Sequence, residues 1–226
     1  MASHILHSDA DLAAALAVLA EADPRLAKLI DIAGHPALRR RPAGFAGLCA
    51  IICSQQLSTA SAAAIWARLA AAFDPFHHDA LRHARAAKLA RLGLSRPKIK
   101  TMKALGSAIA KGTIDLAALA RMEADAAHGA LTALHGIGPW TADIYLLFCL
   151  GHADAWPAGD LALQEAARLA FGLERRPASK DMIGLAEQWR PWRGVAAHLL
   201  WTYYRALKRR DAVPVEVCSN GAMNAR

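Results

Sequence analysis

The sequence predicts an all-α protein, on three observations. No run of alternating apolar and polar residues is long enough to predict a β-strand. Apolar residues recur instead at helical spacing; Leu12, Leu16 and Leu19, for example, share one helix face. Two helix-forming runs, 124–133 and 140–150, are joined by a turn so short that they predict a tight hairpin of helices.

Caps and breakers mark where the helices begin and end. Ser8 and Ser95 suit N-caps, Pro24 and Pro97 suit first turns, and Gly93 ends a basic amphipathic run. In chain order, the expected helices begin at Ser8 and at Pro24 and then span about 45–55, 58–73, 79–92, 95–111, 115–121, 124–133, 140–150, 160–171, 179–189 and 191–208.

We expect these helices to form one domain, residues 1–212, built from two lobes. A bundle at about 42–133 would pack against a lobe made from both chain ends, 1–41 and 134–212. A cleft between the two lobes would then offer a place for a site. Residues 213–226 are expected to be a flexible tail.

Charge and composition limit the partners. The chain has 27 Lys and Arg against 19 Asp and Glu, a formal net charge of +8, and 55% hydrophobic residues. A basic surface suits a polyanion, although the basic clusters at 39–41, 96–103 and 208–210 could equally be solvated faces. No stretch has the roughly 18 uncharged apolar residues of a membrane span. The start has no signal-peptide pattern, so we expect a cytoplasmic protein with no membrane contact.

Residues 134–142 read Leu-His-Gly-Ile-Gly-Pro-Trp-Thr-Ala, the most informative stretch of the chain. Gly136 and Gly138 can adopt positive φ and leave the backbone bare, and Pro139 suits the first helical position. Bare N–H groups at a helix start favour a phosphate, so the hairpin could clamp a DNA backbone. A Gly-x-Gly turn between helices is also common as a mere connection.

Asp160 follows Pro157-Ala158-Gly159 and begins a helix, 22 residues after Gly138. Asp is a good N-cap, which alone would explain it. A carboxylate at a helix start is also held ionised and fixed in direction, so that in a cleft it could stabilise a cationic sugar.

Three segments indicate a family. Each resembles an element of the DNA-3-methyladenine glycosylase II group of helix-hairpin-helix glycosylases. The element beside the flipped nucleotide resembles residues 54–58 (Ser-Gln-Gln-Leu-Ser), and the hairpin resembles 134–142. The segment with the catalytic aspartate resembles 156–164 (Trp-Pro-Ala-Gly-Asp-Leu-Ala-Leu-Gln). The resemblance implies two helical lobes with the active site in the cleft between them. The chain before Gly44 is too short for the N-terminal α/β domain of some relatives, so we expect none.

By this resemblance Asp160 is the catalytic residue, and Trp140, Trp201 and Tyr145 are candidates for the base pocket. Electron-rich rings attract a cationic base face to face. Core packing is the alternative for each aromatic. Relatives can carry an aromatic residue at the position of Ile144, and here the tyrosine lies one residue later.

The resemblance also implies a DNA interface. Gln56 or Leu57 would fill the gap that the flipped nucleotide leaves, although 55–57 could simply be an exposed helix end. Relatives can hold Na⁺ or K⁺ at the hairpin, here through the carbonyls of Thr132, Leu134 and Ile137, and no other cofactor is implied. The complete DNA-binding set is Gln55, Gln56, Leu57, Gly136, Gly138 and Thr141.

The implied activity is hydrolysis of the N-glycosidic bond of alkylated purines, 3-methyladenine and 7-methylguanine, in damaged double-stranded DNA. Members that also cut the backbone have a lysine at the position of Trp140, so no lyase activity is expected. Cys49, Cys53, Cys149 and Cys218 lack iron–sulfur spacing. Two alternatives stay open: a glycosylase for another lesion, and a non-catalytic DNA-binding module. We expect a nucleoid-associated monomer without an obligate protein partner.

Overall fold

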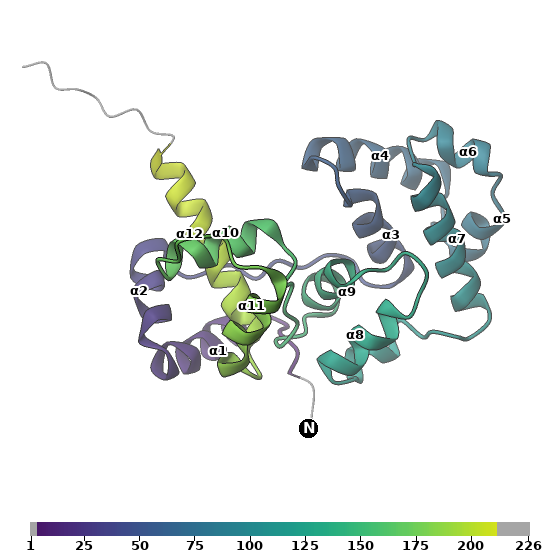
Figure 1. Ribbon diagram of the computed structural model, residues 1–226. Coiled ribbons are helices and arrows are strands. Elements are labelled where there is room, and N and C mark those ends of the chain that lie inside the picture. Colours follow the sequence, from purple (N-terminus) through teal and green to yellow (C-terminus); the bar gives the residue numbers. More distant parts are fainter. Residues whose placement is uncertain (1–3, 212–226) are drawn as a thin grey trace, which may run out of the picture.

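The computed structural model describes residues 4–211, and within them all regular structure is helical apart from one isolated antiparallel bridge between Ile5 and His152. This confirms the all-α prediction. Figure 1 shows two groups of helices with the predicted hairpin between them. The lobe boundaries expected near 42 and 133 stay predictions, and the tail expected at 213–226 lies outside the described residues.

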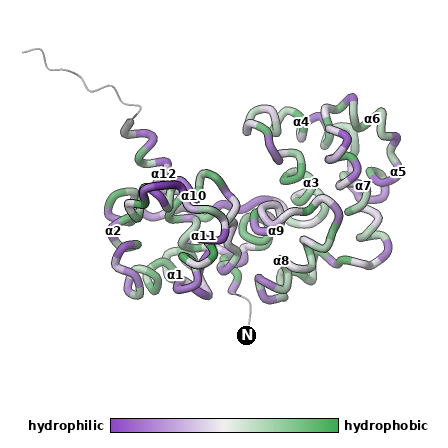
Figure 2. Tube along the Cα trace, viewed as in Figure 1, coloured by the Kyte–Doolittle hydropathy of each residue, from purple (hydrophilic) through white to green (hydrophobic). Residues whose placement is uncertain are grey.

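The first group of helices lies towards the right of Figure 1 and comes from the middle of the chain. It comprises α3 (Gly44–Ser54), α4 (Thr59–Ala72), α5 (His78–His83), α6 (Ala86–Arg91) and α7 (Arg96–Ala110). The mostly apolar α3 packs on α4, α7 and the hairpin helix α9. In the view of Figure 2, α3 lies between α4 and α9.

The second group comes from both ends of the chain. It comprises α1 (Asp9–Ala22), α2 (Pro24–Ala33), α10 (Leu161–Ala170), α11 (Ser179–Ala186), a 3₁₀ turn at Glu187–Trp189, and α12 (Arg193–Asp211). Helix α12 packs on α2 and α10. The chain start joins this group because Leu6 N–H donates to the carbonyl of Gly151 at 2.8 Å and Ala153 N–H donates to that of His4 at 2.8 Å.

Between the groups lies the hairpin of α8 (Ala124–Thr132) and α9 (Pro139–Tyr145), preceded by a 3₁₀ turn at Ala118–Arg121. Helix α9 runs on into a π-helical turn, Leu146–Leu150, which ends at Gly151 in the left-handed conformation. A hairpin of two helices at this position was predicted from the sequence.

Two expected helices differ: the one at 115–121 is only the 3₁₀ turn Ala118–Arg121, and the one at 79–92 is divided. The run 79–92 was expected to be continuous, but it forms the separate helices α5 and α6. Ala84 and Arg85 between them have extended backbone, with ψ of 142° and 134°. Both Leu81 and Leu89 are fully buried, and both α5 and α6 contact α7. The break divides the run into two short helices, and both of them contact α7. Among the described helices, none is long and apolar enough to cross a membrane.

Ion pairs of the buried Arg193 tie the hairpin to the second group. Arg193, at the start of α12, donates to Asp125 on α8 at 2.9 Å and to Asp154 at 2.8 Å. Beside them, Asp143 on α9 is 8% exposed, and its Oδ1 lies 3.7 Å from Nε2 of His128 on α8. Burial raises the pKa of Asp143 from 3.8 to about 8, against the opposing effect of Arg193, and burial lowers the pKa of His128. Both side chains are therefore neutral near pH 7.

This arrangement predicts how stability changes with pH. The folded state keeps the Asp143 proton while the unfolded state releases it, so the contribution of this group to stability falls as pH rises from about 4 to about 8. Asp143→Asn retains the shape of the neutral acid and does not titrate. We expect its free energy of unfolding, relative to the wild type, to rise across this window in urea titrations. The same substitution at exposed Asp31 is the control; parallel curves for Asp143→Asn and wild type would contradict the prediction.

Candidate active site and nucleic-acid interface

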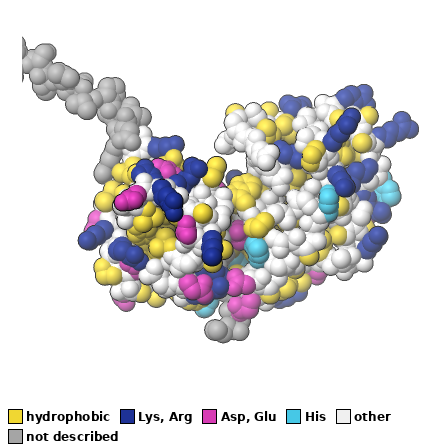
Figure 3. All heavy atoms as spheres, in the orientation of Figure 1, with side chains coloured by type: hydrophobic (Ala, Val, Ile, Leu, Met, Phe, Trp, Pro, Cys, Tyr) yellow, Lys and Arg dark blue, Asp and Glu magenta, His cyan; other side chains and the backbone are white. Residues whose placement is uncertain are grey.

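A cavity of about 750 Å³ opens between the two groups of helices. Helices α3 and α4 line one side of it, while α9, α10 and α12 line another, and the linker at 39–42 runs along its edge. Figure 3 shows the surface notched between the two groups. The volume lies within the roughly 300–1,000 Å³ of small-molecule pockets.

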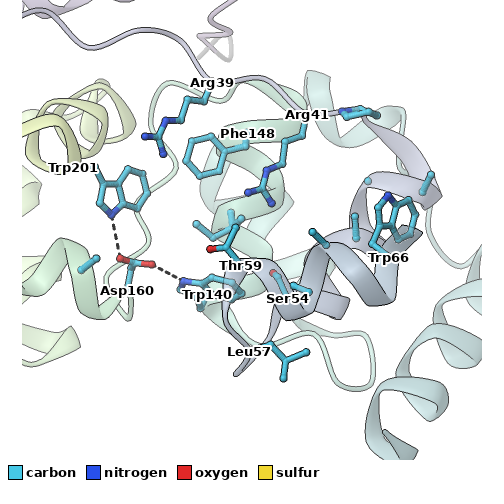
Figure 4. Close-up of a pocket in the computed structure, with 18 of the residues that line it drawn as sticks. Arg39, Arg41, Ser54, Leu57, Thr59, Trp66, Trp140, Phe148, Asp160 and Trp201 are labelled. Atoms are coloured by element: carbon cyan, nitrogen blue, oxygen red, sulfur yellow. Dashed lines mark hydrogen bonds between the residues drawn. The ribbon is translucent and has the colours of Figure 1, made fainter. Parts of the chain in front are cut away.

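Asp160 lies in this cavity and is held by three donors. It caps α10, since its Oδ1 accepts Leu163 N–H at 2.9 Å. The indole N–H of Trp140 donates to Oδ2 at 2.9 Å and that of Trp201 donates to Oδ1 at 3.1 Å, as the dashed lines in Figure 4 show. The three contacts fix the direction of the carboxylate. Three of the sequence-predicted residues, from three helices, therefore meet at one point.

The two indoles thus have a contact that the sequence did not suggest. Trp140 and Trp201 were expected as faces for a base, and both do line the cavity. Their N–H edges also orient Asp160, so each ring both lines the cavity with its apolar face and donates a hydrogen bond to the carboxylate. Tryptophan suits this double task because its large apolar body carries one hydrogen-bond donor.

The expectation for Tyr145 is wrong. This side chain is fully buried outside the cavity lining, and its hydroxyl accepts Gly44 N–H at 3.0 Å at the start of α3. Ile144 and Phe148 line the cavity instead. Residues 140, 144 and 148 are spaced by four and share a helix face, whereas 145 points away from it. That spacing is the signal that could have found Phe148 in the sequence.

Phe148 extends the aromatic wall. Its ring stacks on that of Trp201 with centroids 5.5 Å apart and planes at 28°. Behind both rings lies His198, which is 3% exposed, with its ring 5.5 Å from that of Phe148. Burial lowers the pKa of His198 to about 4, so it is neutral at physiological pH. His198 therefore adds no positive charge behind this wall.

The two glycines of the hairpin differ. Gly136 has φ of +78°, and a Cβ there would clash with Oγ1 of Thr101 on α7, so both the backbone angle and the lack of space favour glycine. Gly138 has φ of −86°, and a Cβ there would meet nothing within 4 Å. Both glycines are exposed, while Ile137 between them is 3% exposed and anchors the turn in the core. The backbone around Gly138 is thus open to an approaching partner.

One of the three carbonyls predicted to bind a cation already accepts a hydrogen bond within the turn. Of the three carbonyls, that of Leu134 accepts Ile137 N–H at 3.1 Å, which leaves it one lone pair. A cation held by Thr132, Leu134 and Ile137 stays a prediction.

The loop after α3 borders the cavity with Leu57, which is 41% exposed. Gln56 is exposed and has φ of +55°, an uncommon conformation for a side-chain-bearing residue. Gln55 instead turns inward and donates to Oγ1 of Thr141 on α9 at 2.8 Å. Thr141 is 2% exposed, so its side chain is too buried to make the expected contact with DNA, and that prediction is wrong. The pair links this loop to the hairpin.

Lys98 on α7 is a second anchor of the loop. Its Nζ donates to the carbonyls of Cys53 and Gln55, each at 2.9 Å. These carbonyls close the end of α3, where a cation is favourable. The sequence offered no signal for this role, because the contact joins segments more than forty residues apart.

We expect Lys98→Met to slow the base release predicted from the sequence about tenfold or more, because it would misplace the loop that is expected to lie beside the flipped nucleotide. Binding of undamaged duplex should weaken only as for Lys100→Met, which removes an exposed charge from the same helix. Single-turnover rates and dissociation constants for both variants separate positioning from simple loss of charge. Equal rates in the two variants would contradict the role of Lys98.

The charge of the molecule is concentrated on the first group. Residues 44–114 carry ten Lys and Arg and two Asp, which accounts for the whole formal net charge of +8. Figure 3 shows many of these basic side chains over the side of α4 to α7. Such a surface attracts a polyanion to the side of the molecule that bears the loop and cavity.

The family model described as HhH-GPD superfamily base excision DNA repair protein matches residues 49–191. The chain is 34% identical over 209 residues to the probable bifunctional transcriptional activator/DNA repair enzyme AlkA of Mycobacterium tuberculosis. That alignment spans 88% of this chain but 41% of the mycobacterial protein, so the chain covers less than half of this curated relative.

Two solved structures are similar over most of their length. DNA-3-methyladenine glycosidase from Bacillus halodurans matches with a TM-score of 0.75 and 30% identity, covering 84% of this chain and 89% of that one. Schizosaccharomyces pombe 3-methyladenine DNA glycosylase Mag1, in complex with abasic DNA, matches with a TM-score of 0.75 and 26% identity, covering 83% and 94%.

Proposed function

Because the chain belongs to the HhH-GPD superfamily of base excision DNA repair proteins, we propose that it is a monofunctional DNA glycosylase for alkylated purines. It hydrolyses the bond between C1′ and the purine in 3-methyladenine and 7-methylguanine nucleotides. The observation that carries the proposal is the Asp160 carboxylate, fixed in an aromatic cavity by the indole N–H groups of Trp140 and Trp201.

Access to the bond requires that the nucleotide leave the duplex stack. The hairpin at 136–138 holds the backbone, and Gln56 or Leu57 fills the space that the nucleotide vacates. The extruded base enters the cavity against Trp140, Phe148 and Trp201. A purine alkylated at N3 or N7 is cationic, and the electron-rich rings favour it over a neutral base.

Bond cleavage moves the positive charge from base to sugar. The electron pair of the C1′–N bond goes to the purine, which departs neutral and needs no strong general acid. The sugar becomes an oxocarbenium-like cation, which the Asp160 carboxylate stabilises electrostatically. Water then adds to C1′, with Asp160 orienting it, and its proton passes to solvent. Trp140 offers no amine for a Schiff base, which supports hydrolysis without backbone cleavage.

The test is incubation of the protein with methylated duplex DNA and identification of the released bases by mass spectrometry. Release of 3-methyladenine or 7-methylguanine, with strand breaks only after alkaline treatment, is the expected result. Activity confined to 8-oxoguanine or uracil in a lesion panel would assign another substrate. DNA binding without release of any base would make the chain a binding module.

A further inference from the structure

Two arginines at the edge of the cavity have no part in the function proposed so far. Arg39 and Arg41 lie on the linker 34–43, which joins α2 to α3 without regular structure. Both line the cavity, and Figure 4 shows their side chains directed into it beside Phe148. Leu57 lies at the other side of the cavity in this view.

The linker holds these side chains in place through the residue between them. Arg40 donates to the carbonyls of Leu6 at 2.6 Å and Cys149 at 3.3 Å, and Arg41 N–H donates to the carbonyl of Phe148 at 2.8 Å. Successive side chains of an extended segment point to opposite sides. With Arg40 turned inward to the protein, its two neighbours turn toward the cavity.

Neither guanidinium is neutralised within the protein. Among residues 4–211, the side chains of Arg39 and Arg41 have no hydrogen bond or ion pair; that of Arg41 lies over the ring of Phe148 at 5.7 Å. Both residues are exposed. Two free positive charges therefore face the space where the proposed function puts a cationic base.

A cationic base and two guanidinium groups in one cavity repel one another unless an anion lies between them. The Asp160 carboxylate in this cavity makes its hydrogen bonds to Trp140, Trp201 and Leu163 and none to the arginines. The anion that an extruded nucleotide brings with it is its own phosphodiester, and the planar guanidinium group suits bidentate binding of a phosphate. We infer that Arg39 and Arg41 bind a phosphodiester group beside the extruded nucleotide, as a phosphate site separate from the hairpin. The inference rests on the proposed function, because that function supplies the extruded nucleotide.

The test compares the double variant Arg39→Gln/Arg41→Gln with Arg85→Gln/Arg91→Gln, which removes two exposed charges at α6, away from the cavity. Binding is measured against salt concentration for a duplex with a tetrahydrofuran abasic-site analogue and for the undamaged duplex. For the cavity variant on the abasic duplex, the slope of log K against log salt should fall by about 1–2. Affinity at 0.1 M salt should fall about tenfold or more. On the undamaged duplex, the salt slopes and affinities of the two variants should differ far less.

Equal slopes for the two variants on the abasic duplex would overturn the inference. An unchanged slope, with selective loss of 7-methylguanine release relative to 3-methyladenine, would also overturn it, because the arginines would then contact the O6 acceptor of the base. Thermal unfolding checks that both variants are folded. Base release by the wild-type protein tests the proposed function separately, since the binding measurements need no catalysis.

Discussion

Asp160→Asn should reduce the single-turnover rate of base release by a factor of about 10²–10³ or more, while affinity for DNA changes little. Loss of one preorganised electrostatic group typically costs that much. The asparagine carbonyl can still accept Leu163 N–H and cap α10, so the fold should persist. The amide presents its own N–H groups to one indole, which disturbs the clamp made by Trp140 and Trp201.

Asp115→Asn is the matched control. Asp115 is an exposed carboxylate that also accepts backbone N–H groups, from Ala117 at 2.8 Å and Ala118 at 3.2 Å, outside the cavity. We expect it to release bases at the wild-type rate. A wild-type rate for Asp160→Asn would exclude a direct action of this carboxylate on the sugar and would leave it as a helix cap.

Gly136→Ala should destabilise the protein by at least about 2 kcal/mol, since the positive φ and the crowding each typically cost 1–3 kcal/mol. The new Cβ would clash with Oγ1 of Thr101 and would lie 2.9 Å from its Cβ and 3.0 Å from its Cγ2. For a domain of this size the melting temperature should fall by about 4–8 °C. Thr101→Ala in the same chain removes Oγ1 and Cγ2 and should restore part of the loss, while Cβ of residue 101 remains. No recovery in the double variant would show that contact with Oγ1 and Cγ2 is not the cause.

Gly138→Ala separates binding from stability. Its Cβ meets no neighbour and its φ of −86° is ordinary, so the melting temperature should match the wild type. Affinity for damaged and undamaged duplex should fall to a similar extent, because phosphate contacts carry no sequence information. Fluorescence anisotropy with both duplexes measures this. Unchanged affinity would show that no DNA phosphate binds at Gly138.

The helices and the central motif were largely predictable from sequence. The hairpin was expected at 124–133 and 140–150 and lies at α8 and α9, since glycines and a proline in register impose a turn whatever surrounds them. Asp160 was expected at a helix start and caps α10, because capping depends on neighbours three residues away. Local rules suffice for such features.

The surroundings of the site were less predictable. Tyr145 was one position from a predicted pocket residue, yet its hydroxyl accepts an N–H from Gly44, 101 residues earlier, while Phe148 faces the cavity. A helix turns by about 100° per residue, so an error of one position changes which side of the helix faces the cavity. The break of 79–92 into α5 and α6, which both contact α7, was likewise not predicted.

Sequence by itself determined the all-helical fold, the position of the hairpin and the carboxylate at 160, because each depends on short-range backbone preferences. Only the tertiary structure decided that two indole N–H groups hold that carboxylate, that Lys98 and Thr141 fasten the loop at 55–57, and that Arg39 and Arg41 face the cavity. These contacts join segments distant in the chain. Their geometry depends on how helices pack, and no local pattern encodes that packing.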